Sequence, residues 1–342
     1  MPAKLIAIDS LILSRDIIPN NCRIEDQLVG TGFENLMEFA GRICYDSIHG
    51  LGRGTSEYFQ NILDSEHYSI LSHVWVGFAI EASEDFYKVL SLEPGVFLID
   101  NKFSSRSPMA SILIINLRAL YRMAVLGVYQ YDQIGIDWSE KTSSVSVPVR
   151  RTIEICAMIA KESIAPHVFK NFNYSFDDNK FMERLKSYIE IVRIPDYFRP
   201  FSFHITCSRS CSHELIRHNY QVAISQRSTR FCDESNSKFV IHPKQSTDKA
   251  VSMPIISNMF SQYKEIFNKE FSESKDRKTA RGIAARYLPH GLETQLIMTF
   301  PYFVLENVFR YRLAPIGVDQ EIYDIANEMK NQIILLEQPI NG

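Results

Sequence analysis

Residues 213–231 gather side chains suited to binding phosphate groups and nucleobases. They include three arginines, a histidine, a glutamine and a serine, namely Arg217, His218, Gln226, Arg227, Ser228 and Arg230. Guanidinium groups bind phosphate through two parallel hydrogen bonds, and hydroxyl and amide groups can bind the edge of a base. A helix end that leads into such a loop is a candidate nucleotide site. The alternative is a solvated charged loop, and spacing alone gives the two interpretations about equal weight.

A metal site is the second chemistry to weigh in this region. His204, Cys207, Cys211 and His213 lie close together in the sequence. Zinc sites usually combine a Cys-x-x-Cys pair with a second pair at a distance. Here two thiols four residues apart favour cysteines that face one core. We therefore expect no metal, and a zinc site stays the minor alternative.

The composition is that of an ordinary globular protein. The chain has 342 residues, 45% hydrophobic and 23% charged, which suits two domains or one elaborated domain. The net charge of -3 shows no basic excess, so we expect no nucleic acid as partner. The N-terminus lacks a signal-peptide pattern, and the most apolar stretch, 110–129, carries Arg118 and Arg122. We expect no membrane contact, reduced cysteines and a cytoplasmic location.

The elements that must position residues 213–231 can be read from the hydrophobic pattern. Strands are expected at 5–13, 74–80, 201–206 and 296–300. Helices are expected at 34–47, 59–63, 210–217, 302–311 and 319–334, and two further helical stretches within 264–287. Between 84 and 200 the patterns are mainly helical, at 86–90, 110–126, 149–161 and 181–192. Strands and helices do not alternate regularly, which predicts an α+β fold.

Four segments taken in order resemble one known family. Residues 217–231 read Arg-His-Asn, a spacer, then Ser-Gln-Arg-Ser-Thr-Arg-Phe. Residues 38–47 carry Ala-Gly-Arg-Ile-Cys-Tyr, and residues 66–83 carry two histidines, His67 and His73, six positions apart. Residues 280–313 run from an Ala-Arg pair through Leu-Pro to a helix ending in arginine. Together they resemble the flavin-dependent thymidylate synthases, the ThyX class.

The resemblance implies a fold and an activity. It covers 34–83 and 201–335 and implies one ThyX-like catalytic domain over 1–342, with a central mixed or antiparallel sheet flanked by helices. Residues 84–200 would form a mainly helical insertion. The family methylates dUMP to dTMP, with methylene-tetrahydrofolate as carbon donor and FADH2, re-reduced by NADPH, as hydride source. Its members are homotetramers with shared active sites.

The resemblance also implies roles for individual residues. The catalytic residues would be Ser228, Arg217 and Arg312, with Ser228 as a positioning group, since a serine without an adjacent base is a poor nucleophile. The substrate would be bound by Glu214, Arg217, Gln226, Ser228, Arg230, Arg286 and Arg312. The flavin would contact His73, His218, Asn219, Gln226 and Asn307.

Departures from the family pattern leave alternatives open. Asn219, Pro301 and Phe303 stand where the family has residues against the flavin, and Gly77 replaces a threonine. The first alternative is an enzyme of the same fold that acts on another pyrimidine nucleotide. The second is a catalytically silent nucleotide-binding homologue. For His73, the plain alternative is a hydrogen-bonded core histidine.

Overall fold

The computed structural model of the chain describes residues 2–12, 31–47, 54–81, 94–100, 110–125, 146–172, 189–244 and 249–337. The chain divides into two compact units, each considered by itself below. Unit 1 comprises Met1–Ile6, Phe39–Gly50 and Ser202–Gly342, and unit 2 comprises Ala7–Glu38 and Leu51–Phe201. Three of the boundaries between them fall inside the strand β1 (Ala3–Ile8), the helix α1 (Gly32–Tyr45) and the strand β7 (Pro200–Ser208).

A five-stranded sheet with the order β2-β1-β7-β9-β8 combines two N-terminal strands with three strands of the C-terminal half. Its strands are β1 (Ala3–Ile8), β2 (Leu11–Ile12), β7 (Pro200–Ser208), β8 (Ala223–Gln226) and β9 (Glu293–Pro301). The long strands β7 and β9 are buried along most of their length, which their apolar sequences explain. β8 pairs antiparallel with β9 and carries the middle of the 213–231 segment.

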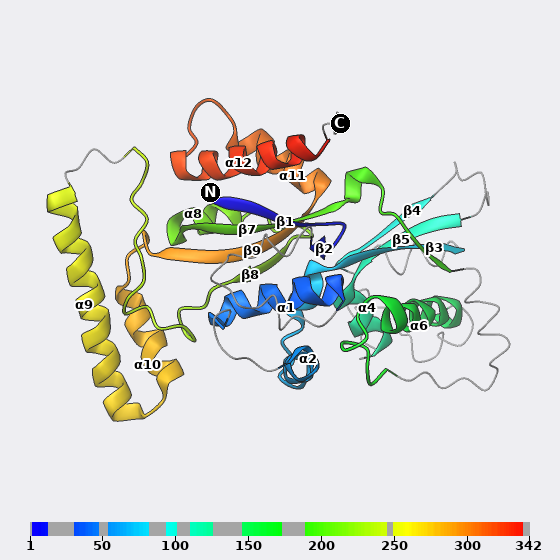
Figure 1. Cartoon of the computed structure of the whole chain (residues 1–342), viewed down its shortest axis with the longest axis horizontal. Coiled ribbons are helices and arrows are strands. Elements are labelled where there is room, and N and C mark those ends of the chain that lie inside the picture. Colours follow the sequence, from blue (N-terminus) through cyan, green and yellow to red (C-terminus); the bar gives the residue numbers. More distant parts are fainter. Residues whose placement is uncertain are drawn as a thin grey trace. The chain divides into compact units, whose positions relative to one another are not determined.

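Helices cover this sheet in unit 1. The helices α11 (Tyr302–Arg312) and α12 (Gln320–Glu337) lie along one face of the sheet (Figure 1). The apolar stripe of α12 follows helical spacing and is buried at Ile322, Ile325, Ala326, Met329 and Ile333. The short helix α8 (Arg209–Leu215) follows β7 directly, so the site residues sit where a buried strand turns into a helix.

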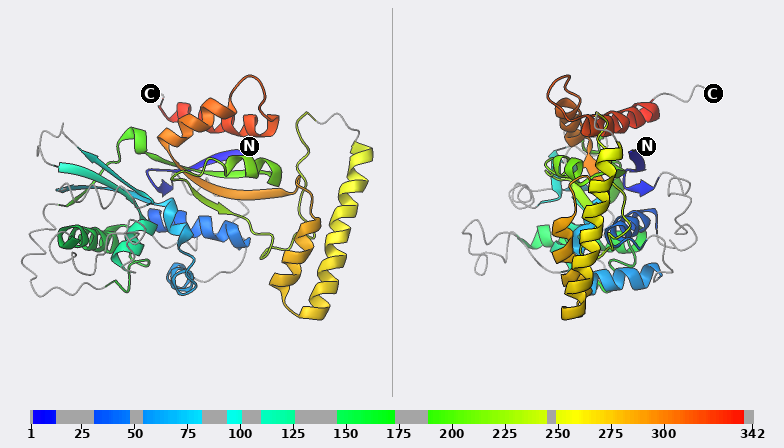
Figure 2. Two further views of the ribbon diagram at one scale, coloured as in Figure 1. Left: turned by 180° about the vertical axis from the view of Figure 1, so that it is seen from behind. Right: turned by 90° about the vertical axis from the view of Figure 1, so that its left-hand side faces the viewer.

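Two further helices of unit 1 run side by side (Figure 2). They are α9 (Lys249–Ser274) and α10 (Arg277–Ala284), followed by the short turn η5 (Ala285–Tyr287). Tyr263, Phe267 and Phe271 stack along α9 at four-residue intervals. The guanidinium groups of Arg277 and Arg281 lie over these rings, which adds a cation–π contribution to the helix pair.

Unit 2 contains a four-stranded antiparallel sheet with the order β4-β5-β3-β6. Its strands are β3 (Trp75–Glu81), β4 (Val96–Asp100), β5 (Ala110–Asn116) and β6 (Glu190–Val192). The helices are α2 (Thr55–Asp64), α4 (Leu117–Ala124) and α6 (Ser146–Ser163), and α4 and α6 lie side by side (Figure 1). The helix α1 (Gly32–Tyr45) and the short turn η2 (Tyr68–His73) complete the described elements that matter below.

The α+β fold class is confirmed, and most expected elements are present. Two expectations were wrong, and the first concerns residues 110–116, which form a strand rather than the start of a helix. Likewise 190–192 form β6, whereas residues 181–188 and 86–90, expected to be helical, lie outside the described residues. None of the helices in the described part of the chain has the length and apolar run that crossing a bilayer requires.

Candidate functional site

Ser208 fixes the start of α8, the helix that leads into the 213–231 segment. Its hydroxyl accepts a hydrogen bond from the Cys211 N–H at 3.0 Å, the geometry of a helix N-cap. The same hydroxyl donates to Oε2 of Glu321 at 2.6 Å, and the Ser208 N–H donates to Oε1 at 2.7 Å. Both carboxylate oxygens of a residue on α12 therefore hold the strand-to-helix junction.

The end of α8 brings Glu214 and His218 against Arg312 of α11. Nη1 of Arg312 lies 3.0 Å from the Glu214 carboxylate, and Nη2 donates to the Glu214 backbone oxygen at 3.1 Å. Nε of Arg312 donates to Nε2 of His218 at 3.0 Å. The exposed Arg217 forms a further ion pair with Glu214 at 3.1 Å. The sequence placed these four residues in one site, and they do lie together.

His218 titrates below its ordinary range. Burial lowers the pKa of His218, and the positive charge of Arg312 lowers that pKa further, while Glu214 acts in the opposite direction. His218 is therefore neutral at pH 7, as an imidazole must be to accept a hydrogen bond from a guanidinium.

The side chain of Gln226 links β8 to α8 and to β9. Its amide nitrogen donates to the hydroxyl of Ser212 on α8 at 2.9 Å and to that of Thr294 on β9 at 3.3 Å. Ser212 and Thr294 are buried. The Gln226 amide is half-buried and tied to protein groups, so it fixes β8 against α8.

Ser228 begins the tight turn after β8. Its N–H donates to the Cys44 carbonyl of α1 at 2.9 Å, and its own carbonyl accepts from the N–H groups of Phe231 and Cys232. Its hydroxyl accepts from the Arg230 N–H at 3.3 Å. Among the described residues no histidine or carboxylate hydrogen-bonds to this hydroxyl, which suits a positioning role better than a nucleophile.

Arg230 and Arg286 present guanidinium groups at the surface beyond this turn. Arg230 is exposed, and its Nε lies 3.7 Å from where a Cβ would stand on Gly282 of α10. Arg286 in η5 lines a pocket of about 270 Å³ together with Arg209, His213 and Thr229. The pocket lining holds two arginines and no carboxylate, next to the Ser228 turn. This charge favours the binding of an anion.

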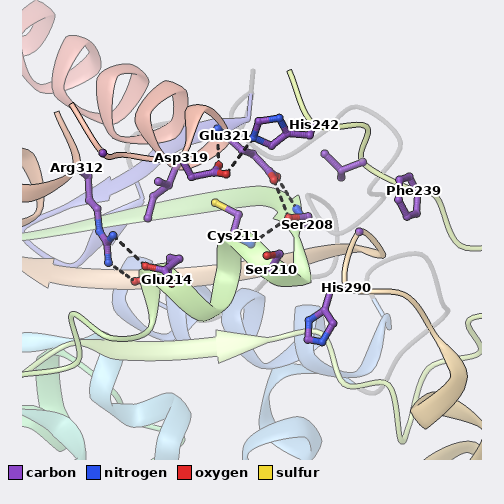
Figure 3. Close-up of a pocket in the computed structure, with 14 residues that line it drawn as sticks. Ser208, Ser210, Cys211, Glu214, Phe239, His242, His290, Arg312, Asp319 and Glu321 are labelled. Carbon is purple, nitrogen blue, oxygen red and sulfur yellow. Dashed lines mark hydrogen bonds and ion pairs between the residues drawn. The ribbon is translucent and has the colours of Figure 1, made fainter. Parts of the chain in front are cut away.

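A larger pocket of about 560 Å³ adjoins it, and His290 lines both. Figure 3 shows Arg312 and Glu214 at one end of this larger pocket and His290 with Phe239 at the other. The α8 residues Ser210 and Cys211 lie between the two ends. The pocket is therefore polar along its length.

The rim of the larger pocket is held by a hydrogen bond between His242 and Asp319. Nε2 of His242 lies 3.0 Å from Oδ2 of Asp319, while Oδ1 of Asp319 accepts from the Glu321 N–H at 2.9 Å and begins α12. Sequence reasoning missed His242, Asp319 and His290. A helix N-cap pattern at Asp319 was the only signal present.

The remaining site residues lie apart from this cluster or at its edge. Asn219 is exposed after α8, and Asn307 is exposed on α11, where its amide oxygen accepts from Arg310 at 2.9 Å. Phe303 contacts the exposed ring of Tyr220, and Pro301 ends β9. His73 belongs to unit 2 and is fully buried, which lowers its pKa to about 3.

The cysteines considered as zinc ligands are placed in the core. Cys207 near the end of β7 and Cys211 in α8 are both buried. A hydrogen bond with Cys207 and burial raise the pKa of the Cys211 thiol. Neutral thiols are poor metal ligands, since zinc binds the thiolate. Within the described ranges no cluster of three or more His, Cys, Asp or Glu has the geometry of a metal site.

The fold and site define an α+β protein with a polar, arginine-bearing pair of pockets beside the 213–231 segment. The family model described as "Thymidylate synthase complementing protein" matches residues 198–335. Residues 198–335 of the chain are therefore similar to the flavin-dependent thymidylate synthase family. The resemblance read from the sequence is confirmed. The matched range contains every site residue named above except His73.

Individual relatives are distant. The flavin-dependent thymidylate synthase of Mycobacterium tuberculosis (strain H37Rv) is 32% identical over 143 residues, which cover 39% of this chain and 56% of the relative. The enzyme of the same name from Mycobacterium avium is 32% identical over 138 residues, covering 37% and 54%. The chain thus spans about half the length of the curated relatives it matches.

Proposed function

We propose that this protein is a flavin-dependent thymidylate synthase that converts dUMP to dTMP. The observation that carries the proposal is the position of Arg312, which lines one pocket together with Glu214 and is hydrogen-bonded to His218, within the part of the chain that matches the family. The order of motifs in the sequence supports the same activity. Methylene-tetrahydrofolate would supply the carbon, and NADPH would re-reduce the flavin.

The nucleotide is proposed to span the two adjoining pockets. Its phosphate would occupy the cationic pocket at Arg286, with Arg230 and the Ser228 turn nearby. Its pyrimidine ring would reach Arg312 in the larger pocket. Negative charge that develops on a ring carbonyl oxygen would then lie beside a guanidinium that stays protonated. Arg217 and Gln226 would complete the binding set.

The residues proposed for the flavin offer hydrogen-bonding and stacking groups to such a ring system. Asn219 and Asn307 offer exposed amides, and Tyr220, 66% exposed, offers a ring face for stacking. His218 would contact the flavin through the parts of its ring that Arg312 leaves free. Hydride donation is the chemistry that a bound reduced flavin supplies. His73 is also proposed for the flavin by family resemblance, although in this structure it is fully buried.

Several of the proposed contacts are open to solvent. Arg217, Asn219, Arg230, Arg286 and Asn307 are exposed in the single chain. In a homotetramer with shared active sites, a second subunit would cover such exposed site residues. We propose that arrangement here. We also propose that the protein is cytoplasmic and that residues 1–342 form a single catalytic domain.

The test is cofactor and substrate binding by the purified protein. The protein is incubated with FAD and desalted, its visible spectrum is recorded, and dUMP, UMP and dCMP are then titrated in turn. Retained flavin bands that shift with dUMP at lower concentration than with UMP or dCMP are expected. A preference for another nucleotide would favour the alternative substrate. Nucleotide binding by a protein that retains no flavin would favour the silent homologue.

A further inference from the structure

The guanidinium group of Arg312 is held on three sides by two residues of one short segment. Its Nε–H is accepted by Nε2 of His218 and an N–H of Nη2 by the Glu214 backbone oxygen, while Nη1 forms an ion pair with the Glu214 carboxylate, all between 3.0 and 3.1 Å. The backbone oxygen belongs to the last turn of α8, where helices leave carbonyl groups without an intrahelical partner. Arg312 therefore also caps the end of α8, where a positive charge is favoured.

These contacts use three of the five N–H donors of a guanidinium group. Within the described part of the chain the other two stay available, one on each terminal nitrogen. Arg312 is only 18% exposed, and it lines the larger pocket (Figure 3). A side chain fixed in this way presents its two remaining donors without losing rotamer freedom when an acceptor arrives.

We propose that Glu214 and His218 are positioning residues that hold Arg312 ready for a carbonyl oxygen of the pyrimidine ring. The inference rests on the proposed function, since that function supplies the ring. It assigns His218 a role through Arg312, in addition to any contact with the flavin. It also gives Glu214 a task other than direct contact with the substrate.

The arrangement requires a neutral His218 with its hydrogen on Nδ1. The charged groups that face His218 among the described residues are Arg312 from α11 and Glu214 from α8. Protonation of Nε2 would set one N–H against another and break the contact with Arg312. Arg312 would then keep only its two contacts with Glu214, and its orientation would loosen as the pH falls.

The first test compares dUMP affinity, from pH 8 down to a pH below the pKa of His218, for the wild type, His218→Gln and His218→Leu. Glutamine keeps an acceptor near the Nε2 position but does not titrate. We expect His218→Gln to bind like the wild type at pH 8 and more tightly than the wild type below the pKa of His218, which the NMR titration of the second test supplies. His218→Leu should bind about three- to tenfold more weakly at pH 8, the effect of one lost hydrogen bond.

Because the phosphate of dUMP also titrates near pH 6, the readout is the difference between variants, with His67→Gln as the matched control. His67 is exposed and lies in unit 2. Identical affinity of the wild type and His218→Gln below the pKa of His218 would overturn the proposal, as would full affinity in His218→Leu.

The second test needs no ligand. The imidazole nitrogens are labelled with 15N, and the His218 resonances are assigned by their loss in His218→Gln. In the wild type, Nε2 should show the shift of an unprotonated acceptor. The pKa of His218 should rise in Arg312→Gln and fall in Glu214→Gln, because these variants remove its positive and negative neighbours.

A His218 pKa that ignores both substitutions would overturn the inference. The two tests also distinguish the proposed function from the positioning of Arg312 by Glu214 and His218. If the wild type binds no dUMP at any pH while the NMR results hold, the proposed function fails and the held geometry of Arg312 stands.

Discussion

The guanidinium of Arg227 bridges two carboxylates, and the one from Glu234 is almost completely buried. The Glu234 side chain is 1% exposed, while the second partner, Asp46, is 48% exposed. Burial opposes ionisation, yet the hydrogen bond and the charge of Glu234 raise the pKa of Arg227 above its ordinary value. Arg227 directly precedes Ser228, so these ion pairs hold the start of the Ser228 turn.

Removing Arg227 should therefore destabilise the protein strongly. Arg227→Ala leaves a buried carboxylate that keeps its hydrogen bond from the Ser237 hydroxyl but loses its cation. We expect a loss of about 3–5 kcal/mol in the free energy of unfolding, measured by urea denaturation. Asp46→Asn should cost less than about 1 kcal/mol, because the Asp46 carboxylate is exposed and asparagine tolerates the positive φ of this position. Equal losses in the two variants would contradict the assignment.

Gly77 is predicted to be intolerant of the side chain that the family has there. A Cβ on Gly77 would stand 2.8 Å from the Val192 backbone oxygen, because Gly77 of β3 pairs with Val192 of β6. Gly77→Thr should lower the free energy of unfolding by about 1–3 kcal/mol through overpacking. Ala79→Thr, on the same strand, is the comparison. A stable Gly77→Thr would show that β6 can move away at little cost.

The stability of unit 2 should fall in mild acid because of His73. Burial lowers the pKa of His73 to about 3, so the unfolded chain binds this proton from about pH 6.5 downward and the folded chain does not. Stability from this source is complete above pH 6.5 and is lost as the pH falls. Between pH 6.5 and 5 the loss should be about 2 kcal/mol in urea unfolding. An NMR titration of His73 with a midpoint near 6.5 would refute it.

Ser208→Ala should weaken the junction that begins α8. The substitution removes both the N-cap acceptor and the hydrogen bond to Glu321, while the backbone contact with Glu321 stays. We expect about 1–2 kcal/mol less stability and weaker dUMP binding, because α8 carries Glu214. Ser272→Ala, at an exposed hydroxyl late in α9, is the control and should change neither. Loss of binding without loss of stability would point to direct contact between Ser208 and the ligand.

The sequence was sufficient for the elements whose apolar pattern is unambiguous. The stripe of α12 and the strands β7 and β9 are of this kind, and so is the step from β7 into α8. It failed at residues 111–115, where an unbroken apolar run suits a buried strand and a buried helix equally. The strand gives way to a helix at Asn116, whose side chain accepts a hydrogen bond from the Ala119 N–H at 2.8 Å and caps the start of α4. Asparagine is a favoured N-cap residue, so Asn116 marks the start of the helix, which the apolar pattern alone does not mark.

For the site, residue types and family order predicted which side chains gather near α8, but not how they bond. No spacing rule links Arg312 to His218, since their contact joins positions 94 apart in sequence. The same holds for Arg227 and Asp46, which are 181 apart. Tertiary packing alone decides such pairs. Local patterns could indicate only the helix caps at Ser208 and Asp319.

The central claim is tested most directly by dTMP formation. The protein, loaded with FAD and reduced by NADPH, is incubated without oxygen with dUMP and methylene-tetrahydrofolate, beside Arg312→Gln and the control Asp196→Asn. Asp196 forms an exposed ion pair with Arg193 in unit 2. We predict turnover by the wild type and the control, and a fall of about 100- to 1000-fold in kcat/KM for Arg312→Gln. Absence of dTMP from a wild type that binds both flavin and dUMP would contradict the account.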